Sequence, residues 1–129
     1  MKIIDGTNAI LGRLASYAAK EALKGEELVI LNCEKIIITG NKKNIEKEFQ
    51  EKRDRVGSGQ KGPKISRSSD KIVKRTIRGM VAHRYKRGKD ALKKIRCYVG
   101  VPKEFENQKK IIAGKEKPIK FISVEGISK

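Results

Sequence analysis

The 129-residue sequence predicts a three-layer α/β domain, with a small, mainly parallel sheet of about four strands flanked by helices. Segments with strand and helix patterns alternate along the chain, and two apolar runs lack the polar alternation of a half-exposed strand. Residues 2–33 have the spacing of a strand–helix–strand crossover. No internal repeat or domain boundary interrupts the pattern, so we expect one domain over residues 1–129.

The first strand and helix are predicted by residues 2–25. Lys2–Asp5 is short and apolar, and Thr7 or Asn8 in the following turn can cap a helix. Leucines and alanines recur at helical spacing over residues 11–23, with lysines and arginine on the far side. Gly25 is expected to end this helix, whose small side chains permit close packing on a sheet.

Two further strands and a second helix are expected over residues 28–54. Leu28–Cys33 is a continuous apolar run, as in a strand covered on both faces of a parallel sheet, and Ile36–Thr39 is a second such run. Residues 41–54 predict a helix in which Ile45 and Phe49 form an apolar pair one turn apart. Its other faces are mostly charged, so we expect it on the outside of the domain.

A basic, glycine-rich loop is expected at Arg55–Ser69, which has too few apolar residues to bury itself. Such a segment is either a plain linker or a segment that orders on a partner, and the cationic helices after it favour the second interpretation. Ser69 and Asp70 are expected to form the cap and first turn of the next helix. Gly79 and Gly88 are expected to punctuate two helices.

The stretch from Ile72 to Gly100 predicts two short helices, each apolar on one side and cationic on the other. In the first, the two sides hold Ile72, Val73, Thr76, Ile77 and Met80, opposite Lys71, Lys74, Arg75 and Arg78. In the second, an apolar stripe of Ala91, Leu92 and Ile95 is surrounded by Lys86, Arg87, Lys89, Lys93 and Lys94. We expect the apolar sides to enter the core and the cationic sides to face an anionic partner.

The end of the chain carries weaker signals. Ile95–Val99 predicts another strand, and the chain is polar from Pro102 to Lys110. Ile119–Val124 is apolar and can add an edge strand. The structure of the tail over residues 105–129 is the part that the sequence predicts least.

Positive charge is concentrated in the middle of the chain. The net charge is +17, from 32 Lys and Arg against 15 Asp and Glu, and residues 51–96 alone hold 17 basic against 4 acidic residues. A generally lysine-rich surface, as in many thermophile proteins, would carry matching acidic residues everywhere, and only the outer thirds fit that description. The imbalance favours a polyanion-binding surface over a solvated cationic face.

The composition also indicates which polyanion. Aromatic residues are only 5% of the chain and do not repeat in the strand pattern of RNA-recognition motifs, and no zinc-finger ligands or basic zipper exist. Recognition by backbone charge and shape suits folded RNA better than a sequence-specific DNA site. A DNA-binding module and a small phosphate-substrate enzyme on an α/β scaffold remain as alternatives.

Nucleotide and metal sites find little support. Gly6 and Gly12 lack the dinucleotide-binding spacing and no phosphate-binding loop motif exists, so turn chemistry explains them better. Cys33 and Cys97 lie in apolar runs, form no CxxC pair, and are expected to be buried free thiols in a reducing compartment. With one histidine and two distant cysteines, a structural metal site is close to excluded.

Catalysis is also not indicated. His83 lies between the two cationic helices, where it either donates to a phosphate or, as we favour, has a structural role such as capping a helix end. Asp90 lies among basic residues and is expected to be a salt-bridge partner. No general acid–base pair is suggested, so we expect no enzyme activity and no cofactor. No apolar stretch is long enough to span a membrane, which favours a cytosolic protein.

Several sequence blocks closely resemble the large-subunit ribosomal protein L13 family, in the family's order over roughly residues 3–104. They are LGRLAS at 11–16, NCEK at 32–35 before ITG at 38–40, RTIRGM at 75–80, RGKDAL at 87–92 and YVGVP at 98–102. Gly-Pro-Lys at 62–64 resembles the archaeal and eukaryotic branch, and the short length suggests archaea. The family usually has a proline where this chain has Ala82 and often one where Ser69 stands, and the tail after Glu106 matches poorly.

The resemblance implies a non-enzymatic constituent of the cytoplasmic large ribosomal subunit that docks on its RNA, acts early in assembly and contacts neighbouring ribosomal proteins. The family's RNA-facing segment maps onto Arg53–Arg67, the RTIRGM helix and the HRYKRG turn, within a basic segment at 52–96. Arginines are favoured because a guanidinium holds a phosphate with two parallel hydrogen bonds. The expected RNA contacts are Arg53, Arg55, Lys61, Lys64, Arg67, Lys71, Lys74, Arg75, Arg78, His83, Arg84, Lys86, Arg87, Lys89, Lys93 and Lys94.

Overall fold

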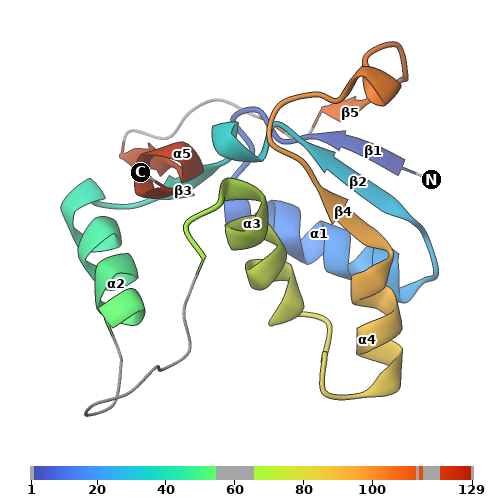
Figure 1. Ribbon diagram of the computed structural model, residues 1–129, viewed down its shortest axis with the longest axis horizontal. Coiled ribbons are helices and arrows are strands. Elements are labelled where there is room, and N and C mark those ends of the chain that lie inside the picture. The colour runs from blue at the N-terminus through green and yellow to red at the C-terminus, as the bar shows by residue number, and fades with distance from the viewer. Residues whose placement is uncertain (1, 55–65, 113, 115–119, 129) are drawn as a thin grey trace.

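A four-stranded parallel sheet forms the centre of the computed structural model, which describes residues 2–54, 66–112, 114 and 120–128 (Figure 1). The strand order is β4-β2-β1-β5, and every neighbouring pair is parallel. The strands are β1 (Lys2–Asp5), β2 (Leu28–Leu31), β4 (Ile95–Cys97) and β5 (Ile111–Ile112). This confirms the predicted α/β class and its mainly parallel sheet.

α-Helices cover one face of the sheet, and a short 3₁₀ helix packs on the other. α1 (Leu11–Leu23), α3 (Ser69–Arg78) and α4 (Lys86–Lys93) enclose a core that includes Ile4, Ile30 and Ile95. On the opposite face, Phe105 of a 3₁₀ helix (Lys103–Phe105) packs on Ile3, Val29 and Leu31. Alternate residues of β1 and β2 therefore pack into two cores, one on each face of the sheet.

The α1 crossover has the bounds that its periodicity predicts. Gly25 ends it with φ +99°, and the amides of Gly25 and Glu26 donate to the carbonyls of Ala22 and Glu21 at 3.0 and 3.2 Å. The predicted cap is wrong, because Ile10 precedes the helix without a side-chain cap. Thr7 instead donates to Asp5 Oδ1 through its amide at 3.0 Å and its hydroxyl at 2.8 Å.

The second apolar run leaves the main sheet. β3 (Ile37–Thr39) is a strand as predicted, but it pairs antiparallel with β6 (Phe121–Ser123) in a separate two-stranded sheet. Asn32 has φ +55° and begins a 3₁₀ turn (Cys33–Lys35), which ends β2 and redirects the chain. The expectation of a fully covered parallel strand at Ile36–Thr39 is therefore wrong, whereas the edge strand near residues 119–124 is confirmed.

Two further helices lie at the periphery. α2 (Lys42–Asp54) has no fully buried residue, and Ile45 and Phe49 provide its half-buried side, as the charge pattern predicts. Asn41 Oδ1 accepts the Lys43 amide at 3.0 Å and so caps its first turn. α5 (Val124–Ser128) ends the described chain. The glycine-rich loop predicted at Arg55–Ser69 lies outside the described residues up to position 65.

Both cysteines are free thiols, with Cys33 buried and Cys97 half-buried. The neighbouring Cys97 thiol and burial both raise the pKa of the Cys33 thiol, which keeps it protonated and unreactive. In the described ranges, no group of three potential metal ligands comes together. None of the described helices has the length and apolar character needed to cross a membrane.

Candidate nucleic-acid interface

The first cationic helix, α3, separates its apolar and basic sides as predicted. Ile72, Val73 and Ile77 are buried, and Arg75 and Arg78 are exposed on the other side. The apolar side packs mainly on α1, with further contacts to β4 (Figure 1). Because the core fixes one side of α3, its cations are presented from a rigid base.

The start of α3 differs from prediction by one residue. Ser68 occupies the capping position, and its hydroxyl contacts the Asp70 carboxylate in the first turn. Ser69, the predicted cap, is the first helical residue and is buried. Met80 was placed on the apolar side, but its side chain is 43% exposed because the helix has already ended at Arg78.

A tight turn over residues 79–85 joins α3 to α4. Gly79 ends α3 as predicted, and buried Val81 anchors the turn in the core. His83 Nδ1 lies 3.2 Å from the Arg78 carbonyl, which supports the structural, helix-capping role. Ala82 has φ +52°, so the family's usual proline, whose ring fixes φ near −65°, cannot adopt this geometry.

The second helix starts directly after the turn, and Gly88 lies inside it rather than at its end. A Cβ at position 88 would stand 2.1 Å from the carbonyl oxygens of both Val81 and Ala82. The predicted role of Gly88 as a helix boundary is therefore wrong, because its lack of a side chain instead allows α4 to approach the turn. Ala91 and half-buried Leu92 form the predicted apolar stripe.

The basic residues of this region are not neutralised by internal partners. Residues 69–94 contain ten Lys and Arg against Asp70 and Asp90. Within the described part of the chain, the ion pairs join Lys2 and Lys24 to Glu21, at 2.7 and 3.6 Å, and none involves α3 or α4. Asp90 makes no ion pair with a described residue, so its predicted salt bridge is wrong. The surface therefore carries a concentration of positive charge without acidic partners among the described residues.

The predicted contact residues have different positions. Arg55, Lys61 and Lys64 lie outside the described residues. Arg67 Nη2 donates to Gln50 Oε1 at 3.0 Å and so bridges to α2. Arg53 and Lys74 are partly buried, like His83. Arg67 is exposed, and so are Lys71, Arg75, Arg78, Arg84, Lys86, Arg87, Lys89, Lys93 and Lys94.

One exposed aromatic residue in this region was not predicted as a contact. Tyr85 is 73% exposed between Arg84 and Lys86, immediately before α4. An exposed phenol between two cations can stack on a nucleobase. The signal was present in the sequence as the HRYKRG turn, but exposure cannot be read from a single aromatic residue without its fold.

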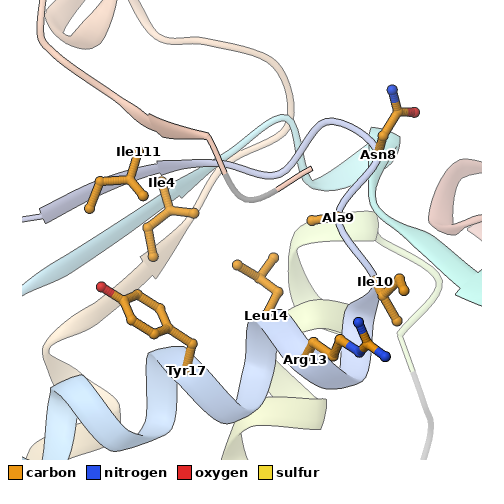
Figure 2. Close-up of a pocket in the computed structure, with 8 residues that line it drawn as sticks. All are labelled: Ile4, Asn8, Ala9, Ile10, Arg13, Leu14, Tyr17 and Ile111. Carbon is orange, nitrogen blue, oxygen red and sulfur yellow. The ribbon is translucent and has the colours of Figure 1, made fainter. Parts of the chain in front are cut away.

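An apolar cavity of about 320 Å³ lies between β1 and α1, and no residue of α3 or α4 lines it. Figure 2 shows Leu14 and Tyr17 of α1 pointing toward Ile4 of β1, with Arg13 at one side. Arg13 is the one charged residue in its lining. Its other polar side chains are those of Asn8 and Tyr17, and among the described residues its lining holds no carboxylate, histidine or thiol.

Comparisons with known proteins identify the chain's relatives. The family model described as ribosomal protein L13 matches residues 1–104. The chain is 44% identical to large ribosomal subunit protein uL13 of Methanocaldococcus jannaschii, over 100% of this chain and 96% of that protein. It is 47% identical to the uL13 protein of Methanopyrus kandleri, over 81% and 65% of the two chains. It is 46% identical to the uL13 protein of Methanosarcina barkeri, over 86% of this chain and 79% of that protein.

Proposed function

The chain belongs to the ribosomal protein L13 family and is a non-enzymatic structural constituent of the cytoplasmic large ribosomal subunit, and we propose that it docks on ribosomal RNA through α3, α4 and the turn between them. We call this the α3–α4 surface, meaning the exposed basic residues from Lys71 to Lys94. The relatives are archaeal, in agreement with the predicted branch.

The observation that carries this proposal is a dense set of basic side chains without ion-pair partners among the described residues, on helices that pack against the core. Ion pairs are absent from the described part of α3 and α4, so binding RNA does not require breaking internal bridges. Each phosphate that a lysine or arginine neutralises releases condensed counterions, which favours association. The buried sides of both helices reduce the entropy lost when these cations bind.

Individual residues are proposed to act in two ways. Arg75, Arg78, Arg84 and Arg87 would hold phosphates with paired hydrogen bonds, which fix orientation. The lysines would add charge without a fixed direction. His83 already contacts a backbone carbonyl through Nδ1, so its phosphate contact would use Nε2.

The order of assembly follows from where the charge lies. Residues 1–50, which build β1, α1 and β2, have almost balanced charge, so this part can fold before RNA neutralises the rest. The basic helices would then bind phosphates, and the loop expected to contact the partner at 55–65 lies outside the described residues. Contacts with neighbouring large-subunit proteins would complete the site.

The test compares two pairs of substitutions at matched charge. Arg78→Ala with Arg87→Ala should weaken binding to large-subunit ribosomal RNA and reduce the slope of log K against log salt by about 1–2, since each lost phosphate contact contributes about 0.7–0.9. The control, Lys103→Ala with Lys109→Ala, removes two exposed cations outside the α3–α4 surface.

Thermal unfolding of both double variants should match that of the original chain, because the substituted side chains are exposed and without described ion pairs. Equal weakening by the two double variants would contradict a specific surface. Unfolding of the Arg78/Arg87 variant would instead place these arginines in the core network. Equal affinity for duplex DNA at matched salt would favour a general nucleic-acid-binding role.

A further inference from the structure

A groove of about 540 Å³ lies between α2 and α3, beside the α3–α4 surface. In Figure 1, α2 stands apart from the rest of the helical layer, opposite α3. The lining of the groove includes Ile38 of β3, Ile45 and Phe49 of α2, and Ile72 of α3. A volume of this size is within the range of small-molecule sites.

The groove combines an apolar interior with charged groups at its walls. Phe49 is half-buried, so one part of its ring packs on the core while the rest lines the groove. Lys52 and Arg75, from opposite walls, are exposed and make no ion pair with a described residue. Glu48, also in the lining, adds a carboxylate that can accept hydrogen bonds.

We propose that this groove binds one unstacked nucleobase of the ribosomal RNA, with the base against Phe49 and its flanking phosphates between Lys52 and Arg75. The inference rests on the proposed function and adds a base-binding site to it. A nucleotide matches the groove because its base is flat and largely apolar on its faces, whereas its backbone is anionic. Glu48 would accept a hydrogen bond from an exocyclic amine of the base.

Other occupants match these groups less well. A phosphate alone would leave the Phe49 and Ile45 surface exposed to water. An apolar peptide side chain would leave Lys52 and Arg75 without anionic partners. Arg75 belongs both to the groove and to the α3–α4 surface, so an RNA strand that follows the basic face reaches the groove without interruption.

The experiment uses the full chain bound to large-subunit ribosomal RNA and measures the reactivity of each nucleotide's 2′-hydroxyl toward an acylating reagent. Phe49→Leu keeps the side chain apolar and removes the ring. The expected result is that one or two nucleotides gain reactivity and that affinity falls roughly fivefold or more, because base–aromatic stacking is lost. Tyr17→Leu, which removes a 39% exposed ring from α1, should change neither.

Lys52→Gln supplies a second variant whose exposed side chain is not needed for folding, and it should expose the same nucleotides as Phe49→Leu. The charge control is Lys42→Gln at the start of the same helix, which should leave them protected. If the original chain protects RNA and both groove variants give the same protection pattern, the proposed base site is wrong although the proposed function stands. If the original chain protects no nucleotides, the proposed function itself fails.

Discussion

At position 88 the backbone of α4 touches the backbone of the preceding turn, so a single methyl group should move the helix. Gly88→Ala would place Cβ 2.1 Å from two carbonyl oxygens, and we expect it to lower the free energy of unfolding by about 1–3 kcal/mol, as overpacking does. RNA affinity should fall with it, because α4 carries much of the basic surface. Chemical denaturation and RNA titration would measure both effects.

The matched control is Gly12→Ala in α1, where a Cβ meets nothing within 4 Å. Alanine is the better helix former, so this substitution should raise the free energy of unfolding by about 0.5 kcal/mol and leave RNA affinity unchanged. If Gly88→Ala changes neither the free energy of unfolding nor RNA affinity, α4 can shift without cost, and its exact position does not determine how the cations are presented.

Asp5 links the end of β1 to the turn that redirects β2. Its Oδ1 accepts hydrogen bonds from Thr7 and from Asn32 Nδ2 at 3.0 Å. Burial raises the pKa of Asp5, but these hydrogen bonds outweigh it, so the pKa lies below the ordinary value of 3.8. The stabilisation by the carboxylate is therefore complete above pH 3.8 and is lost as pH falls through the lower, folded-state pKa.

Asp5→Asn tests this dependence, because the amide keeps an acceptor oxygen but carries no charge. We expect the variant to be less stable at pH 7 by no more than about 1 kcal/mol, since the site is partly exposed. The difference from the original chain should close below pH 4, as measured by urea unfolding at several pH values. If the difference stays the same as pH falls through the folded-state pKa of Asp5, packing rather than the charge is responsible.

At the scale of helices and strands, sequence patterns were informative where one element determines its own limits. α1 was predicted residue for residue, because its apolar spacing and Gly25 are local signals. The cationic sides of α3 and α4 were likewise visible from helical periodicity. These signals depend on neighbours within one turn of the same helix, so a single sequence contains them.

The incorrect predictions concern contacts between different elements of the fold, which local sequence patterns do not contain. Ile36–Thr39 has the composition of a buried strand, but Ile38 pairs with Ile122, far along the chain, so its sheet could not be inferred. Gly88 was interpreted as a helix boundary because its close neighbours, Val81 and Ala82, belong to a turn of unknown geometry. The α2–α3 groove combines residues from several elements and was not predicted.

The peripheral position of α2 leads to a prediction about its dynamics. α2 has no fully buried residue, whereas α1 buries most of one side, so opening α2 exposes much less apolar surface. Backbone amides of α2 should therefore exchange with deuterium faster than those of α1 in the free protein. Binding to ribosomal RNA should slow exchange in α2 if the groove is occupied, and mass spectrometry of peptides from the two helices would measure this.

For the whole molecule, the arrangement of charge separates folding from docking. The segment that builds β1, α1 and β2 is nearly neutral, and most of the excess charge lies on residues 51–96, which include α3 and α4. Self-repulsion is thus concentrated on the surface that we propose binds RNA. The same chain can then remain folded when free and gain binding energy mainly from phosphates.

Salt should distinguish docking by shape from loose electrostatic attraction. At about 1 M salt the Debye length is about 3 Å, so only contacts at hydrogen-bonding distance persist. Paired arginine–phosphate bonds on a preformed surface meet this condition, and we expect the chain to sediment with the large subunit after such a wash. The Arg78→Ala, Arg87→Ala variant should leave at lower salt, because it loses two directional contacts, whereas the Lys103→Ala, Lys109→Ala variant loses the same charge and should stay bound. If the original chain also moves to the top of the gradient at modest salt, its attachment depends on diffuse charge, and the fixed geometry of α3 and α4 contributes nothing to it.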